Sequence, residues 1–207
     1  MIQRHRAFWL LLALCASTAL LILALMPAEK TLGQVIKIVY LHGALSRAGM
    51  LGFAAAGIAA GAYLVRPRPQ IIRWAVALLV SGWSFWVAHF LVSMPATRLT
   101  WGPWIAWGEP RVAMTLQIAA AGLIVLGVSA LLREPRFTAI AIALLALTIA
   151  VMAARTGVLR HPLDPIGTSP SATLRFIYLL LLLPIVASMF LIAWRLAAGP
   201  SRLEMAS

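Results

Sequence analysis

Six continuous apolar runs, each about as long as a bilayer is thick, constrain this chain more than any other feature. A helix needs about 20 apolar residues to cross the hydrocarbon core. The runs do not alternate between polar and apolar residues, which excludes an outer-membrane barrel. We therefore predict an all-α membrane protein, a six-transmembrane helical bundle with a tryptophan-rich external loop, in a single domain over residues 1–207. The expected spans are residues 7–26, 48–65, 72–93, 112–132, 137–154 and 174–197.

Composition and charge fit this class. The chain is 63% hydrophobic and 11% charged, far from a soluble domain. Its net charge of +12 comes from cations scattered in short loops, which is typical of membrane anchoring rather than of nucleic-acid binding. The first run is longer than the apolar stretch of a cleaved signal peptide, about 7–15 residues, so we expect an uncleaved span. Six spans then put both termini on one side, although the loop cations orient the bundle only weakly.

The long segments between the predicted spans all lie on the face opposite the termini. They are residues 27–47, 94–111 and 155–173, whereas the loops on the other face are short turns. Because function usually resides in long loops held by a rigid scaffold, we expect the functional site on this face.

The central long segment contains a tryptophan repeat, WGPWIAWGEPR over residues 101–111. Trp101, Trp104 and Trp107 recur every three residues, so one helical turn or extended stretch could present the indoles as a platform for a flat ligand. The alternative is an aromatic belt at the level of the lipid headgroups. Belt tryptophans are usually scattered, and the density found here favours the platform.

The two flanking long segments each contribute a histidine, His42 and His161. Two neutral imidazoles are suitable axial ligands for haem iron, and a macrocycle would stack on the indoles. The two propionates of haem would need cations. The nearest cations in the sequence are Arg47, Arg98, Arg111 and Arg160.

These motifs resemble the tryptophan-rich WWD signature of the haem-handling proteins of cytochrome c maturation. Residues 101–111 follow its Trp-Gly-x-Trp-x-x-Trp pattern and its acidic-Pro-Arg motif, with Ile105 in place of one tryptophan and Gly108 as an apparent insertion. Residues 37–42 look like the stretch that carries the first external histidine of the family. The resemblance covers about residues 34–178, and the length fits the CcmC branch better than CcsA or CcmF. After His161 the usual tryptophan-rich segment is absent.

The resemblance implies a function, a location and a set of partners. The protein would hold haem b transiently at the periplasmic face of a bacterial or archaeal inner membrane, with both termini cytoplasmic, and pass it to a CcmE-like haem chaperone. His42 and His161 would ligate the iron, and the tryptophan loop, with Glu109 and Arg111, would cradle the macrocycle. Other implied partners are CcmA- and CcmB-like subunits of an ABC exporter, a small CcmD-like single-span subunit and membrane lipid, but no nucleic acid.

Some features stay open at this point. His89 lies six residues before Pro95, which places it about 9 Å inside that boundary. It is either a further haem ligand or a neutral histidine bonded to a neighbouring helix, while Trp83 and Trp86 read as packing residues. Four glycines lie in the second predicted span, and the G-x-x-x-G from Gly57 to Gly61 predicts close helix packing.

Two other functions compete with haem delivery. The chain could be a permease-like subunit of a haem ABC exporter with no haem of its own, since it lacks a phosphate-binding loop for ATP. An intramembrane enzyme would have to use Glu29, Glu109, Asp164 or the histidines, and these form no Ser–His or paired-carboxylate pattern. The single cysteine, Cys15, cannot form a Cys-x-x-Cys redox pair. We therefore predict that the protein is not an enzyme.

Overall fold

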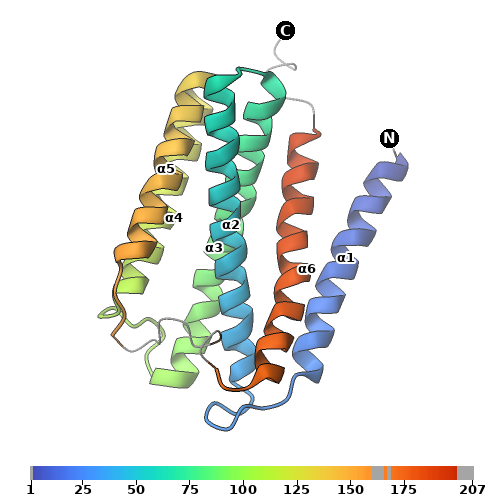
Figure 1. Cartoon of the computed structure of the whole chain (residues 1–207), viewed down its shortest axis with the longest axis vertical. Helices are drawn as coiled ribbons and strands as arrows, with labels where there is room; N and C mark the ends of the chain where they lie inside the picture. The colour runs from blue at the N-terminus through green and yellow to red at the C-terminus, as the bar shows by residue number, and fades with distance from the viewer. Residues whose placement is uncertain (1, 160–165, 167–168, 200–207) are drawn as a thin grey trace.

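The computed structural model describes residues 2–159, 166 and 169–199, with side chains described from residue 6 onward. These residues form six helices, all long and apolar enough to cross a membrane. Helix α1 begins and helix α6 ends at the same end of the bundle (Figure 1), so the predicted all-α six-helix architecture is confirmed. The helices are α1 (Ile2–Leu25), α2 (Ile36–Val65), α3 (Pro69–Trp101), α4 (Pro110–Leu132), α5 (Pro135–Arg155) and α6 (Ala172–Ala197).

Helices α2 and α3 extend beyond their predicted spans. Helix α2 begins 12 residues before residue 48, because residues 36–47 bury Ile36, Tyr40 and Ala44 along one helical face. Helix α3 continues through Pro95 to Trp101, since proline is tolerated in membrane helices whose neighbours satisfy the freed backbone groups. With 30 and 33 residues, the two helices are about 45 and 50 Å long. Both exceed the hydrocarbon core of about 30 Å.

The closest helix contact joins α2 and α3 near their middles. A Cβ atom on Gly52 would lie 2.5 Å from the Cα atom of Gly82, and one on Gly49 would lie 3.1 Å from the backbone nitrogen of Trp86. Neither position has room for a side chain. The predicted G-x-x-x-G makes one close contact only: a Cβ on Gly57 would meet Ala146 of α5 at 2.5 Å, whereas Gly61 faces open space.

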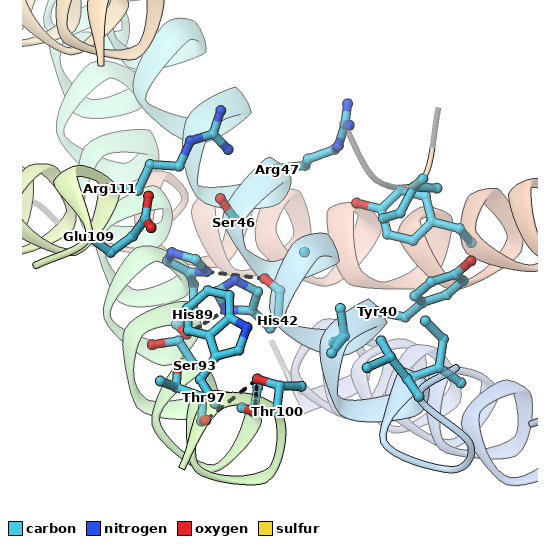
Figure 2. A pocket seen from close by; sticks show the side chains of 18 of the residues that line it. Tyr40, His42, Ser46, Arg47, His89, Ser93, Thr97, Thr100, Glu109 and Arg111 are labelled. Atoms are coloured by element: carbon cyan, nitrogen blue, oxygen red, sulfur yellow. Dashed lines mark hydrogen bonds between the residues drawn. The ribbon is translucent and has the colours of Figure 1, made fainter. Parts of the chain in front are cut away.

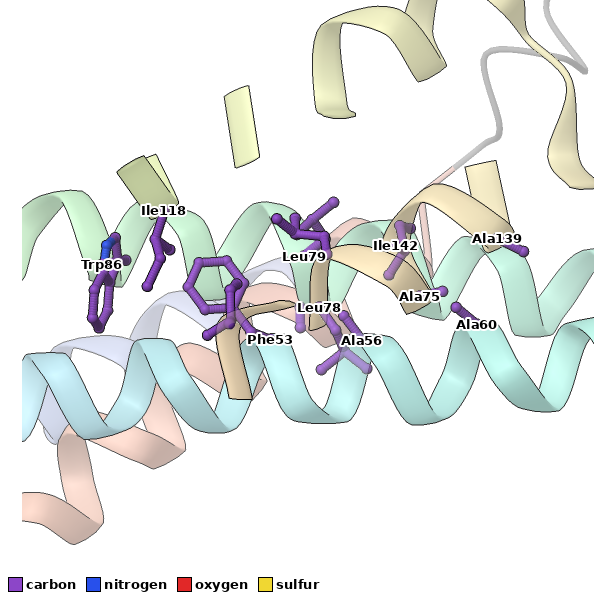
Figure 3. Packing of buried hydrophobic residues seen from close by; sticks show 13 residues of the cluster. Phe53, Ala56, Ala60, Ala75, Leu78, Leu79, Trp86, Ile118, Ala139 and Ile142 are labelled. Atoms are coloured by element: carbon purple, nitrogen blue, oxygen red, sulfur yellow. The ribbon is translucent and has the colours of Figure 1, made fainter. Parts of the chain in front are cut away.

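From this contact toward the chain termini, small and branched side chains fill the bundle. Figure 3 shows Ala56 and Ala60 of α2 facing Leu78 and Ala75 of α3, with α5 packed alongside. The three alanines are completely buried. This half of the bundle is therefore a close-packed apolar core that fixes α2 against α3.

Side-chain hydrogen bonds attach the outer helices α4 and α6 to α3. Trp83 Nε1 donates a hydrogen bond to the carbonyl oxygen of Ala119 on α4 at 2.8 Å, and Ser81 Oγ donates to that of Met189 on α6 at 2.6 Å. Helix α1 packs against α6 (Figure 1). Near the end of α1, the carbonyl oxygen of Ala24 accepts a hydrogen bond from Lys37 Nζ of α2. The interpretation of Trp83 as a packing residue is confirmed.

Candidate functional site

A cavity of about 710 Å³ lies at the end of the bundle where the long segments meet. Its walls are the first half of α2, the second half of α3, the first turns of α4 and α6, and residues 29–32. The volume lies within the range of small-molecule sites, about 300–1,000 Å³. The cavity brings together six of the predicted site residues, several of which Figure 2 shows. They are His42, Arg47, His89, Trp101, Glu109 and Arg111.

His42 and His89 form a reciprocal pair at this cavity. Nδ1 of His42 lies 3.3 Å from the carbonyl oxygen of His89, and Nδ1 of His89 lies 3.2 Å from the carbonyl oxygen of His42 (Figure 2). The two rings stack with their centroids 4.2 Å apart. Because a carbonyl oxygen only accepts, each Nδ1 carries a proton. In the neutral rings, the ligating lone pair is therefore on Nε2.

His42 does not occupy the position predicted for it, whereas His89 lies in the third predicted span and its Nδ1 bonds to the neighbouring helix α2, one of the two alternatives considered for it. His42 was expected in a loop and lies in the second turn of α2, because that helix starts at Ile36. The depth of His89 was measured from Pro95, which does not end α3. The histidine that sequence reasoning placed beside His42 was His161, which lies outside the described residues, as do Arg160 and Asp164.

The cavity-facing side of α3 continues from His89 as a row of hydroxyl groups, Ser93, Thr97 and Thr100. Ser93 Oγ donates to the carbonyl oxygen of Phe90 at 2.6 Å, and Thr100 Oγ1 donates to that of Ala96 at 2.8 Å. Because these protons are engaged, what the two hydroxyls offer a ligand is an acceptor lone pair. Sequence reasoning missed this row because it ended the helix at residue 93. The helical spacing after His89 was the available signal.

Of the three predicted cations that the structure describes, two line the cavity. Arg47 is exposed, with its guanidinium 5.8 Å from the ring centroid of Tyr178. Arg111 is half-buried, and its buried Nε–H has no hydrogen-bond partner among the described residues. Arg98 is exposed, donates to the carbonyl oxygen of Gly102 after the end of α3, and does not line the cavity.

The tryptophan repeat divides between two environments. Trp101 is the last residue of α3 and lines the cavity. Trp104 and Trp107 are 57% and 71% exposed, and neither is part of the cavity lining. The described structure thus brings one of the three indoles to the site, and the platform made of all three stays a prediction.

The two glutamates at this end stabilise loops. Glu109 is buried before α4, and its Oε1 accepts a hydrogen bond from the backbone N–H of Leu159 at 3.2 Å. Glu29 Oε2 accepts from the N–H groups of Thr31 and Leu32, both at 2.8 Å. Hydrogen bonds from these N–H groups, Leu32 first, hold the pKa of the Glu29 carboxyl below its ordinary value.

The last long segment also reaches the cavity, since Ile166, Ser169 and Pro170 are part of its lining. Among the residues that the structure describes, no three His, Cys, Asp or Glu side chains are arranged to hold a metal ion. What the cavity offers is therefore a histidine pair, two cations, the indoles of Trp86 and Trp101, and an apolar wall. Comparison of the chain with protein-family models and with curated proteins finds no match.

Proposed function

We propose that this multi-pass membrane protein binds haem in the cavity between the ends of α2 and α3 and delivers it to a partner. The observation that carries the proposal is the convergence of separate sequence motifs on one cavity. His42, Trp101 and Arg111 come from three helices and were singled out as ligand, stacking surface and propionate partner; all three line the same space.

The position of the histidine pair along the helices supports a site at the membrane boundary. His42 lies 24 residues from Arg66 at the other end of α2, and His89 lies 21 residues from Arg68 before α3. At 1.5 Å per residue these separations are about 36 and 32 Å, close to the thickness of the hydrocarbon core. A ligand there is within reach of water and of a partner outside the membrane.

The residues present fit a haem-sized amphiphile. The ligating lone pair of His42 is on Nε2, because its Nδ1–H donates a hydrogen bond to a backbone carbonyl. Most metal-ligating histidines are oriented by a hydrogen bond of this kind. Val39, Phe90 and Trp101 give apolar contact, and Arg47 and Arg111 are suited to two carboxylates. His161 stays the predicted second ligand from the resemblance to the WWD proteins.

The remainder of the proposal follows that resemblance. The cavity faces the periplasm and both termini the cytoplasm of a bacterial or archaeal inner membrane. Haem b is cargo and not a permanent cofactor. Two imidazoles hold it until it is released to a CcmE-like chaperone. CcmA- and CcmB-like exporter subunits and a CcmD-like single-span subunit would complete the assembly, and the protein itself would catalyse no reaction.

The test is a haem titration of the full chain purified in detergent, followed by ultraviolet–visible spectra of the oxidised and reduced forms. We expect a saturable, low-spin bis-imidazole spectrum from the wild type. His42→Ala and His161→Ala should each lose it, because each removes one axial ligand.

Arg98→Gln is the matched control, since Arg98 lies in the same region but outside the cavity lining. It should bind like the wild type. A wild-type protein that never takes up haem, yet co-purifies with an ATPase, would instead favour a permease-like subunit.

A further inference from the structure

His89 is the cavity residue whose contacts the proposed haem site does not yet explain. It is buried in the second half of α3, and its ring contacts two aromatic neighbours. One is the ring of His42, at 4.2 Å between centroids, and the other is the indole of Trp86, at 4.9 Å. Because Trp86 restrains the ring of His89, that ring is well placed to orient the ring of His42.

The contacts of His89 continue a chain of support across three helices. Trp86 is 2% exposed, and its Nε1 donates to the carbonyl oxygen of Thr115 on α4 at 3.0 Å. Trp86, which is bonded to α4, therefore supports the ring of His89. His89 in turn contacts the ring and the backbone of His42, so that α4 supports the position of the ring on α2.

The close contact between Gly49 and Trp86 explains how each imidazole reaches the opposite backbone. A Cβ on Gly49 would lie 3.1 and 3.2 Å from the backbone nitrogen and Cα of Trp86, so α2 and α3 lie almost in backbone contact there. At this separation each Nδ1 comes within hydrogen-bond distance of the carbonyl oxygen on the other helix. The pair thus depends on backbone proximity.

We propose that His89 is a positioning residue for His42: its ring and backbone carbonyl hold the imidazole of His42 with Nδ1 protonated and the ligating lone pair on Nε2. This inference rests on the proposed haem binding through His42. His89 acts through His42 and does not itself bind the iron. Partners of this kind typically contribute about 10–100-fold to metal affinity.

The test compares His89→Ala, which removes the ring, with His89→Asn, whose amide can replace the Nδ1–H donor. With haem, we expect His89→Ala to bind about 10–100-fold more weakly with a low-spin spectrum at saturation, and His89→Asn to recover most of the affinity. Trp83→Phe is the matched control. Like His89→Ala, it loses a hydrogen bond from a ring N–H of α3 to a backbone carbonyl of a neighbouring helix, but this bond, to α4, lies away from the cavity lining. It should bind haem normally.

Two results would overturn the proposal. If His89→Ala gives the same spectrum as His42→Ala and His89→Asn does not rescue it, His89 is itself a ligand. If His89→Ala leaves both the affinity for haem and the midpoint potential of the bound haem unchanged, His89 does not position His42.

A second measurement, nitrogen-15 NMR of histidine-labelled protein without haem, separates this inference from the proposed function. We expect His42 in the Nδ1–H form in the wild type and in His89→Asn. His89→Ala keeps the acceptor carbonyl of residue 89 but loses the stacked ring and the bond to the carbonyl oxygen of His42, so the imidazole is no longer held against that acceptor and we expect a gain of the Nε2–H form. An unchanged tautomer in His89→Ala would overturn the positioning role. If the wild type fails to bind haem, the proposed function fails, while this tautomer still decides whether His89 orients His42.

Discussion

The two halves of the α2–α3 pair differ in what fills the space between the helices. Toward the termini, Ala56, Ala60 and Ala75 are fully buried and the helices pack closely. Toward the long segments, His42 and His89 line a cavity of about 710 Å³. The comparison teaches that the site depends on the packed half, because the glycine contacts bring the two helices close enough for the histidines to bond across them.

The largest effect should come from filling the tightest contact. Gly52→Ala puts a methyl group 2.5 Å from the Cα atom of Gly82, and backbone atoms cannot move aside as a flexible side chain can. We expect a loss of about 3 kcal/mol or more in stability, measured by thermal unfolding in detergent. Gly61→Ala is the control, since open space surrounds Gly61, and it should be neutral or stabilise the helix by up to about 1 kcal/mol. Equal effects of the two substitutions would contradict the close contact between α2 and α3 at Gly52.

A cation change tests the cavity half. Arg111→Gln should weaken haem binding about tenfold to a hundredfold, because hydrogen bonds to a charged group contribute about 1.5–3 kcal/mol. The dissociation constant from a haem titration measures this, and the melting temperature should barely change. Binding unaffected by the change would remove Arg111 from the site.

The indoles sharpen the boundary of the cavity. Trp101→Ala should weaken haem binding by less than about tenfold, since one aromatic contact contributes about 0.5–1.5 kcal/mol. Trp107→Ala should have a smaller effect, because Trp107 is 71% exposed and outside the lining. Equal losses in the two titrations would mean that haem also contacts the exposed part of the loop, as the platform prediction requires.

The smallest effect concerns the loop at the cavity rim. The pKa of Glu29 is lowered in the folded state, so its contribution to loop stability is present above the ordinary value of 4.5 and is lost as pH falls through the lowered value. Hydrogen-exchange protection of the Thr31 and Leu32 amides should therefore decrease in acid. In Glu29→Gln, protection should be lower at neutral pH and nearly independent of pH; the same acid loss in this variant would assign the effect to another group.

The sequence predicted the number of helices and the face that carries the cavity, because apolar runs and loop lengths are local properties. It misplaced His42 because residues 36–47 mix polar and apolar side chains, as a loop does, whereas in the fold they extend α2 with one buried face. It ended α3 too early because proline usually stops a helix outside the membrane. The contact between His42 and His89 joins residues 47 positions apart, and only the packing of α2 on α3 reveals it.

The central claim, that the cavity between the ends of α2 and α3 holds haem through His42, is tested most directly by the haem content of the loaded protein. The wild type and His42→Ala would be incubated with haem in detergent, passed over a desalting column and assayed as the pyridine haemochrome against protein concentration. The account predicts about one haem per chain for the wild type and almost none for His42→Ala, with both proteins folded. Equal haem content in the two would contradict it.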